Sequence, residues 1–157
     1  MRRKEREVTE FSEIVEILSR CMTIRIGMKG DEYPYVVPIS FGYEVIDGKI
    51  NIYAHGAPAG RKNEYLAKDS LVCVEADIFH KIEPTERGIT TRYESIIGFG
   101  RYESLETAED KKKGLRVLLE RYGYFDYPLD RCRGLEMANV FRIIIDTITA
   151  KRNLAGN

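Results

Sequence analysis

The sequence lacks the usual marks of a metal centre, a disulfide framework and a serine-type hydrolase. Its three cysteines, Cys21, Cys73 and Cys132, stand far apart, form no C-x-x-C pair and are odd in number. Zinc sites and disulfide scaffolds need closely spaced or paired cysteines, so we expect no metal and a reducing compartment. No G-x-S-x-G segment occurs, so nothing indicates a Ser-His-Asp hydrolase.

Excess charge and long apolar runs are also missing. The chain has 25 acidic and 25 basic residues, which gives a formal net charge of zero. Nucleic-acid-binding domains are usually strongly basic, so we expect no nucleic-acid partner. No apolar run approaches the length of a membrane span, and the basic start, Met1–Arg6, continues into acidic residues. We therefore expect no membrane partner, no signal peptide and a cytoplasmic location.

Strand-like segments dominate what is present, and the length fits one domain over residues 1–157. We expect strands at residues 23–28, 35–43, 49–55, 71–79, 90–104 and 139–149, with a hairpin turn at Asp47-Gly48. We expect a helix capped by Thr9, a short helix over Arg61–Lys68, and a third helix capped by Thr107 with Asp110. The buried stripe of this third helix is expected to be Leu115, Leu118, Leu119 and Tyr122. Residues 80–89 and 124–135 are expected to be irregular. Short turns favour antiparallel pairing, so the fold class is mainly β, a small antiparallel β-barrel with peripheral helices.

The junction at residues 51–68 is the most informative stretch. A strand ends at His55, a Gly/Pro-rich turn follows, and Arg61-Lys62 open the short helix. Helix N-termini bind anions because their first N–H groups lack internal partners and the dipole is positive there. Cations are disfavoured at this end unless an anion joins them, and small residues up to Gly60 let a ligand approach the backbone. We interpret the junction as a candidate phosphate site. The alternative is that the basic pair is merely solvated and that the histidine is a structural hydrogen-bonding residue.

Two strand segments are further candidates. Pro38 interrupts the run Val36–Ser40 and removes a ladder N–H, which predicts an edge strand or a bulge. Such a break exposes backbone groups to a flat polar ligand, and an ordinary strand irregularity is the equal alternative. On the strand at 90–104, the side chains of Tyr93, Ser95, Phe99 and Tyr102 either face a partner or a ring system or pack in the core.

The order of these motifs resembles the pyridoxamine 5′-phosphate oxidase-like flavoproteins, and within them the nitroimidazole-resistance (Nim-type) branch. The likeness spans about Arg2 to Lys151 and rests on the segments PYVVPISFGY, DGKI, YAHGAPAGRK, VCVEAD and YESIIGFG. The H-x-x-x-x-G-R-K and S-I-I-G-F-G elements are fairly specific together in this order, and neither suffices alone.

The resemblance implies a split β-barrel that forms a homodimer, with FMN bound in a cleft between the subunits. It implies that Arg61 and Lys62 hold the FMN phosphate, that Gly60 also contacts the cofactor and that His55 lies beside the flavin. The remaining implied cofactor contacts are Val37, Pro38, Ile39 and Ser40 along the isoalloxazine, and Tyr93, Ser95 and Ile96 from the same or the second subunit.

The chain also departs from true pyridoxamine phosphate oxidases. An apolar Tyr-Val-Val-Pro-Ile run replaces a basic residue of their early strand motif, and Lys151–Asn157 lacks their C-terminal Arg/His segment. Vitamin B6 oxidation is therefore not expected. We expect an FMN-dependent oxidoreductase that passes electrons or hydride to a small electrophilic acceptor such as a nitro-aromatic compound, with His55 as the candidate proton donor. The alternatives are a flavin carrier or sensor without turnover, and a related barrel that binds deazaflavin or haem.

Overall fold

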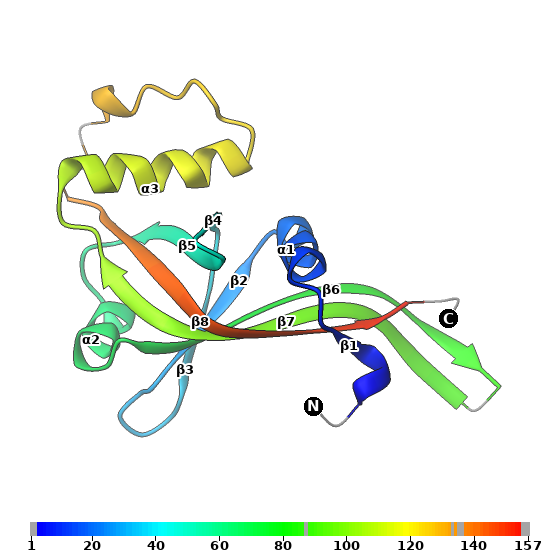
Figure 1. Cartoon of the computed structure of the whole chain (residues 1–157). Helices are drawn as coiled ribbons and strands as arrows, with labels where there is room; N and C mark the ends of the chain where they lie inside the picture. The colour runs from blue at the N-terminus through cyan, green and yellow to red at the C-terminus, as the bar shows by residue number, and fades with distance from the viewer. Residues whose placement is uncertain (1–2, 87, 133, 135–136, 155–157) are drawn as a thin grey trace.

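The strands of the protein form one curved antiparallel sheet with helices on its outside (Figure 1). The computed structural model describes residues 3–86, 88–132, 134 and 137–154. The strands are β1 (Glu7–Val8), β2 (Ile24–Met28), β3 (Tyr35–Ile39), β4 (Gly42–Ile46), β5 (Lys49–Gly56), β6 (Leu71–Thr85), β7 (Gly88–Ser104) and β8 (Asn139–Asn153). The α-helices are α1 (Phe11–Arg20), α2 (Arg61–Lys68) and α3 (Ala108–Arg121), and short 3-10 turns cover Lys4–Arg6 and Leu129–Arg131.

The sheet must curl until its two ends approach each other. The strand order is β3-β2-β6-β7-β8-β5-β4, and β1 pairs with β8. Yet β3 and β4, at opposite ends of this order, are separated in the chain only by Ser40 and Phe41. An open flat sheet cannot satisfy both facts, so the expected antiparallel split β-barrel with peripheral helices is confirmed.

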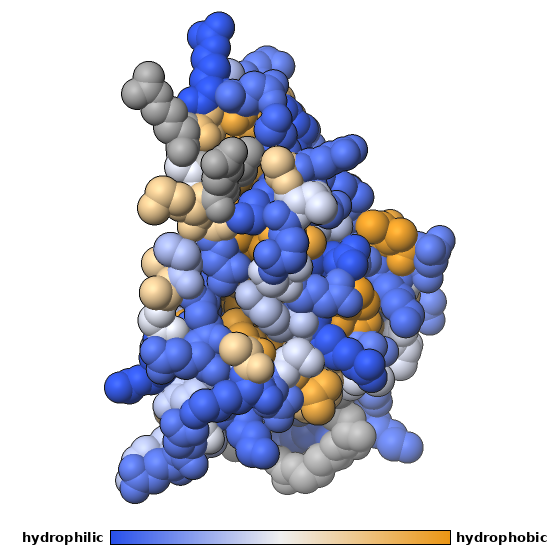
Figure 2. Space-filling model, turned by 90° about the vertical axis from the view of Figure 1, so that its left-hand side faces the viewer, coloured by the Kyte–Doolittle hydropathy of each residue, from blue (hydrophilic) through white to orange (hydrophobic). Residues whose placement is uncertain are grey.

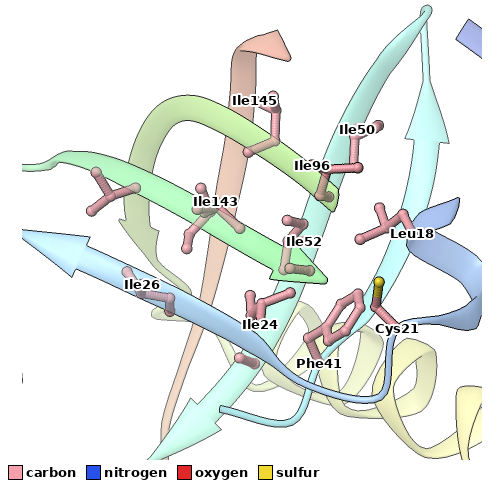
Figure 3. Packing of buried hydrophobic residues seen from close by; sticks show 14 of the residues in the cluster. Leu18, Cys21, Ile24, Ile26, Phe41, Ile50, Ile52, Ile96, Ile143 and Ile145 are labelled. Atoms are coloured by element: carbon pink, nitrogen blue, oxygen red, sulfur yellow. The ribbon is translucent and has the colours of Figure 1, made fainter. Parts of the chain in front are cut away.

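The core fills the inside of the curl. Inward-facing positions alternate along the strands, and isoleucines from β2, β5, β7 and β8 meet residues of α1 there (Figure 3). Phe41, which links the two ends of the sheet, is fully buried in this cluster. Because Phe41 is anchored inside, the end of β3 is held in a fixed position relative to β4 and β5.

The structure confirms the predicted hairpin turn and one predicted helix cap, and it contradicts a second predicted cap. Asp47 and Gly48 have φ angles of 50° and 74°, the left-handed values that a two-residue hairpin requires. Thr107 caps α3, since its hydroxyl accepts a hydrogen bond from the Asp110 N–H at 3.0 Å. Thr9 does not cap α1: the N-cap position belongs to Glu10, and no side chain there bonds the helix.

Two strand predictions were wrong in extent. The run 35–43 is two strands, because the chain crosses from one end of the sheet to the other after Ile39. Residues 80–89 were expected to be a loop, but β6 and β7 continue as a long paired arm as far as Thr85 opposite Gly88. This arm extends beyond the rest of the sheet (Figure 1), so polar residues on it pair as strands without entering a core. Of the expected irregular segment at 124–135, residues 133 and 135 lie outside the described residues, and the 3-10 turn at Leu129–Arg131 falls within it.

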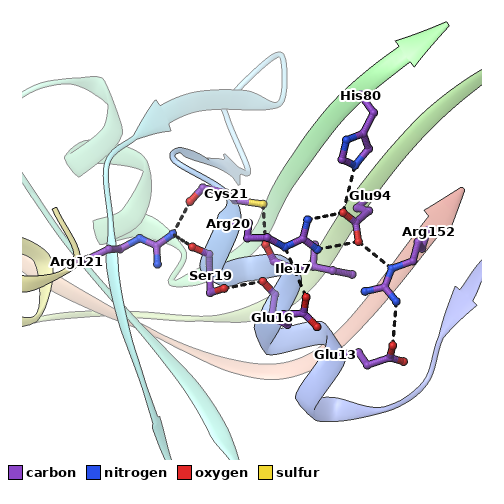
Figure 4. A network of polar contacts seen from close by, with 10 residues as sticks. All are labelled: Glu13, Glu16, Ile17, Ser19, Arg20, Cys21, His80, Glu94, Arg121 and Arg152. Carbon is purple, nitrogen blue, oxygen red and sulfur yellow. Dashed lines mark hydrogen bonds and ion pairs between the residues drawn. The ribbon is translucent and has the colours of Figure 1, made fainter. Parts of the chain in front are cut away.

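A buried ion network ties α1 to the sheet (Figure 4). The carboxylate of Glu94 on β7 has a side-chain exposure of 1%. Arg20 of α1 donates to both carboxylate oxygens, at 2.6 and 2.8 Å, and Arg152 of β8 donates to one of them at 2.8 Å. His80 lies 3.2 Å from the same carboxylate, so this residue belongs to β6 and to the network rather than to a loop.

Among the described residues, no helix has the length and apolar character needed to cross a lipid bilayer.

Candidate functional site

The start of α2 presents unpaired backbone donors. Gly60 occupies the N-cap with φ of 122° and ψ of 169°, a conformation that side-chain-bearing residues rarely adopt. It offers no side-chain cap, and its carbonyl accepts the N–H groups of Asn63 and Glu64. Within the described ranges, the N–H groups of Arg61 and Lys62 have no partner. This end of the helix therefore keeps its positive dipole and two free donors.

Two cationic side chains gather at the same place without a counter-ion. The Arg61 guanidinium lies 6.0 Å from the ring centre of Tyr35, and the Lys62 ammonium lies 4.9 Å from that of Phe141. In the part of the chain that the structure describes, neither forms a salt bridge, although fifteen other salt bridges are present. Burial lowers the pKa of Lys62, because its half-buried ammonium has lost water without gaining an anion.

Gly56 at the end of β5 makes room for this ammonium. A Cβ atom added at Gly56 would stand 2.5 Å from the Lys62 Nζ, closer than any real contact. An alanine there would push the lysine away from Phe141. The sequence marked Gly56 only as one of several small residues, and its specific role depends on how α2 folds back over β5.

An asparagine pair fixes the loop between β5 and α2. The Asn63 side chain donates to the Ala57 carbonyl at 2.8 Å and accepts from the Asn139 side chain at 2.9 Å. Asn139 begins β8, and its own side-chain oxygen is 3.3 Å from the Tyr102 hydroxyl of β7. Sequence reasoning missed both asparagines, because their partners are brought together only by the sheet.

A cavity of about 280 Å³ lies between this loop and β3. Its walls are Tyr35, Val37, Pro38, Ile39, Ala57, Ala59, Gly60, Arg61 and Lys62. The structure thus gathers six of the predicted cofactor-binding residues around one hollow, with cations at one side and an apolar strand at the other. Ser40 follows directly after β3, is exposed and does not line this cavity.

Pro38 sits where its missing N–H is tolerated. Among the described strands, β3 is an end strand that pairs with β2 alone, as the edge-strand prediction required. The strand therefore carries one row of unpaired backbone groups, which are available to a ligand or to another chain.

His55 lies one residue before Gly56 on β5 and faces a different hollow. Consecutive strand residues point to opposite faces, so His55 is directed to the α3 side, and it lines a cavity of about 410 Å³ under that helix. Partial desolvation and then the charge of Lys62 lower the pKa of His55 below its usual value of 6.5, although the residue remains exposed. The imidazole is therefore mainly neutral at pH 7.

The three predicted residues of β7 do not join either hollow within one chain. Ile96 points into the core with an exposed fraction of 1%. Tyr93 and Ser95 are half-buried and alternate with it, so they lie on the outer face of the sheet, where Ser95 pairs with Asp77 and Lys151. These assignments stay predictions that require a second chain.

The surface around α2 is mixed rather than strongly charged. Figure 2 views the molecule from the side on the left of Figure 1, where α2 lies, and hydrophilic residues with scattered apolar patches cover most of it. Among the described residues, no three His, Cys, Asp or Glu side chains group together as metal ligands.

The fold and the motifs agree with comparisons to known proteins. A proposed 5-nitroimidazole antibiotic resistance protein of Bacteroides thetaiotaomicron is 28% identical, with 92% of this chain and 85% of that one aligned at a TM-score of 0.79. The flavocytochrome Anf3 of Azotobacter vinelandii is 18% identical over 99% and 72%, with a TM-score of 0.82. A FAD and heme binding protein of Mycobacterium smegmatis is 18% identical over 96% and 74%, with a TM-score of 0.79. The last two support the fold alone, and a search of curated proteins by sequence found no match. Residues 10–152 match the sequence profile described as pyridoxamine 5′-phosphate oxidase, and the chain belongs to that family.

Proposed function

We propose that this protein binds FMN, with the phosphate held at the start of α2. The observation that carries the proposal is the pair Arg61 and Lys62, two cations at a helix N-terminus with free backbone donors and no counter-ion in the described residues. A phosphate dianion satisfies all of these groups at once, because it accepts several hydrogen bonds and neutralises both charges. The match of residues 10–152 to the pyridoxamine 5′-phosphate oxidase family supports a flavin as the owner of this phosphate.

The flavin ring is proposed to lie along β3. Val37, Pro38 and Ile39 supply an apolar wall of the same cavity, and the unpaired edge of β3 supplies backbone donors and acceptors. Ser40 stands at the end of that edge, within reach of a ligand longer than the cavity. The cavity is open and smaller than typical cofactor sites of about 300–1,000 Å³, so a second wall is needed.

A second copy of the chain is proposed to provide that wall. The outer face of the sheet exposes Val36, Leu71, Ile97 and Phe99, at 56%, 59%, 43% and 58%. Exposed apolar residues on neighbouring strands are typical of an interface. In such a homodimer, the partner's β7 would bring Tyr93, Ser95 and the backbone at Ile96 to the flavin. Changing Phe99 to Asp should then produce monomers in light scattering and weaken FMN binding, whereas an unchanged dimer would contradict this interface.

The proposed activity is electron or hydride transfer to a small electrophilic acceptor, with nitro-aromatic compounds as the first class to test. Bound FMN would supply the redox chemistry, and the chain would bind, orient and shield it. His55, neutral at pH 7, would donate a hydrogen bond from its ring N–H rather than act as a cation. His55 lies on the face of β5 opposite Gly56 and Lys62, so it would meet an acceptor from the α3 side.

The phosphate assignment is tested by comparing FMN with riboflavin, which lacks the phosphate. Changing Arg61 and Lys62 together to Ala should weaken FMN binding by about 2–4 kcal/mol, or about 30- to 1,000-fold in Kd, and leave riboflavin binding nearly unchanged. Lys68→Ala is the matched control, because Lys68 ends the same helix and pairs with Asp31 on the surface. Full FMN affinity in the double variant, or equal weakening of both flavins, would place the phosphate elsewhere.

Turnover and cofactor identity are tested on the purified protein. We expect FMN to compete successfully against FAD, deazaflavin and haem, and the bound flavin to be reduced by NAD(P)H and reoxidised by a nitro-aromatic acceptor without oxygen. Bound FMN that no donor reduces would make the protein a flavin carrier or sensor. Preference for deazaflavin or haem would replace the FMN proposal.

A further inference from the structure

The cavity under α3 has the properties of a separate small-molecule site. Its volume of about 410 Å³ falls in the range of ligand pockets. One wall consists of the α3 residues Leu115, Leu118 and Leu119, of which Leu118 is buried and the other two are half-buried. Most of the lining residues are apolar, which is typical of small-molecule sites.

The opposite wall is aromatic and open to solvent. Tyr124 and Tyr127 line the cavity and are 61% and 47% exposed, so a ligand can enter past them. Leu129 is buried at its edge, and Cys132 is half-buried. A lining that combines two tyrosine rings with several leucines favours a flat apolar molecule.

His55 is the one ionisable nitrogen base that lines the cavity among the described residues. Its pKa is lowered, so at neutral pH it presents one ring N–H and one acceptor nitrogen, without a charge. None of the described lining residues carries a full charge at neutral pH, so a charged ligand would lose its water here without gaining an opposite charge from them. An uncharged ligand with one polar atom loses little hydration free energy on entering the cavity.

We infer that the cavity under α3 binds an uncharged aromatic molecule, with its polar atom hydrogen-bonded to His55 and its rings against the leucines of α3. The site is distinct from the anion site at α2, because none of the residues that the structure describes lines both cavities. The two are neighbours, since His55 and Ala57, one in each lining, are two residues apart on the chain. The inference does not depend on FMN, because it concerns binding in the absence of any flavin.

The test uses N-phenyl-1-naphthylamine, a neutral probe whose fluorescence rises in apolar sites. We expect one saturable site per chain, and binding about tenfold or more weaker for the sulfonated analogue 1-anilinonaphthalene-8-sulfonate. Leu119→Trp fills the cavity and should weaken the neutral probe about tenfold or more. Glu109→Trp, which adds the same ring to the exposed first turn of α3, is the matched control and should change nothing.

Cysteine protection gives a second readout on the unaltered protein. Alkylation of Cys132, which lines the cavity, should slow when the neutral probe is bound, while alkylation of Cys73, which does not line it, should keep its rate. No saturable probe binding, unchanged binding in folded Leu119→Trp, tighter binding of the sulfonate, or equal protection of both cysteines would each overturn the inference.

Discussion

The buried carboxylate of Glu94 offers a quantitative test of what holds the helical and sheet parts together. Arg20, Arg152 and His80 surround it, from α1, β8 and β6, and these hydrogen bonds hold its pKa at about 2. The largest contribution is the two-pronged bond from Arg20, which outweighs the cost of burial.

The contribution of Glu94 to the free energy of unfolding follows from this lowered pKa. An ordinary glutamate has a pKa of 4.5, and the network lowers it to about 2. Each pKa unit corresponds to about 1.4 kcal/mol, so the ionised carboxylate stabilises the folded state by about 3 kcal/mol at pH 7. Glu94→Gln removes this charge at nearly constant volume and leaves the two arginines, which keep partial access to water. We expect the free energy of unfolding to fall by about 3 kcal/mol at pH 7.

The pH dependence of the stability difference tests whether the ionised carboxylate of Glu94 is its cause. A group whose pKa is lowered by folding stabilises the protein above its unfolded pKa, and this stabilisation is lost as the pH falls toward the folded pKa. The difference between the native chain and Glu94→Gln should therefore be nearly complete above pH 5, about 1.4 kcal/mol at pH 3 and less than about 0.5 kcal/mol below pH 2. Urea unfolding followed by circular dichroism at several pH values measures it.

Glu16→Gln is the matched control, because Glu16 contacts the same Arg20 from the exposed surface of α1. Its removal should cost less than about 0.5 kcal/mol at every pH. A loss in Glu94→Gln that is equally small, or one that stays the same between pH 7 and pH 3, would refute the account of Glu94 as a buried, ionised anchor.

Two further predictions concern packing and reactivity. Gly42→Ala should destabilise the protein by about 1–3 kcal/mol in urea unfolding, because the new Cβ would stand 2.6 Å from the backbone of Leu118; a neutral effect would show that α3 is free to shift. Cys21 has an exposed fraction of 1%, and burial raises its pKa to about 11. At pH 8 it should react with iodoacetamide about 100-fold or more slowly than Cys132, and equal rates in a mass-spectrometric time course would contradict its burial.

Local signals in the sequence were sufficient for most features that depend on neighbours in the chain, and the Thr9 cap was the exception. The turn at Asp47-Gly48, the Thr107 cap and the bounds of α2 depend on a few adjacent residues, and all were predicted correctly. The split of 35–43 into two strands was not predictable in this way, because both halves have the same β-prone composition. What separates them is the closure of the sheet, a property of the whole chain.

The same distinction between local and long-range features separates the site residues that were predicted from the contacts that were missed. Arg61, Lys62 and Pro38 were identified because a helix start and a strand proline have recognisable local patterns, and the structure places all three around one cavity. The Glu94 network was missed, because Arg20 and Glu94 are 74 residues apart and neither has an unusual local pattern. His80 was assigned to a loop for the same reason, since its strand pairs in an exposed arm where polar residues carry no signal.

The end of β5 connects the two proposed sites through one charge. Gly56 faces Lys62, whereas His55 on the opposite face of the strand lines the cavity under α3, and the lysine charge contributes to the lowered pKa of the histidine. An anion bound at Lys62 would offset that charge, so inorganic phosphate should raise the pKa of His55 toward its usual value. NMR titration of the His55 ring protons, with and without phosphate, measures the shift, and Lys62→Met should raise the pKa without phosphate and abolish the response. If saturating phosphate leaves the pKa of His55 unchanged, either the two sites are not coupled through the lysine charge or the anion binds away from Lys62, and the proposed link is refuted.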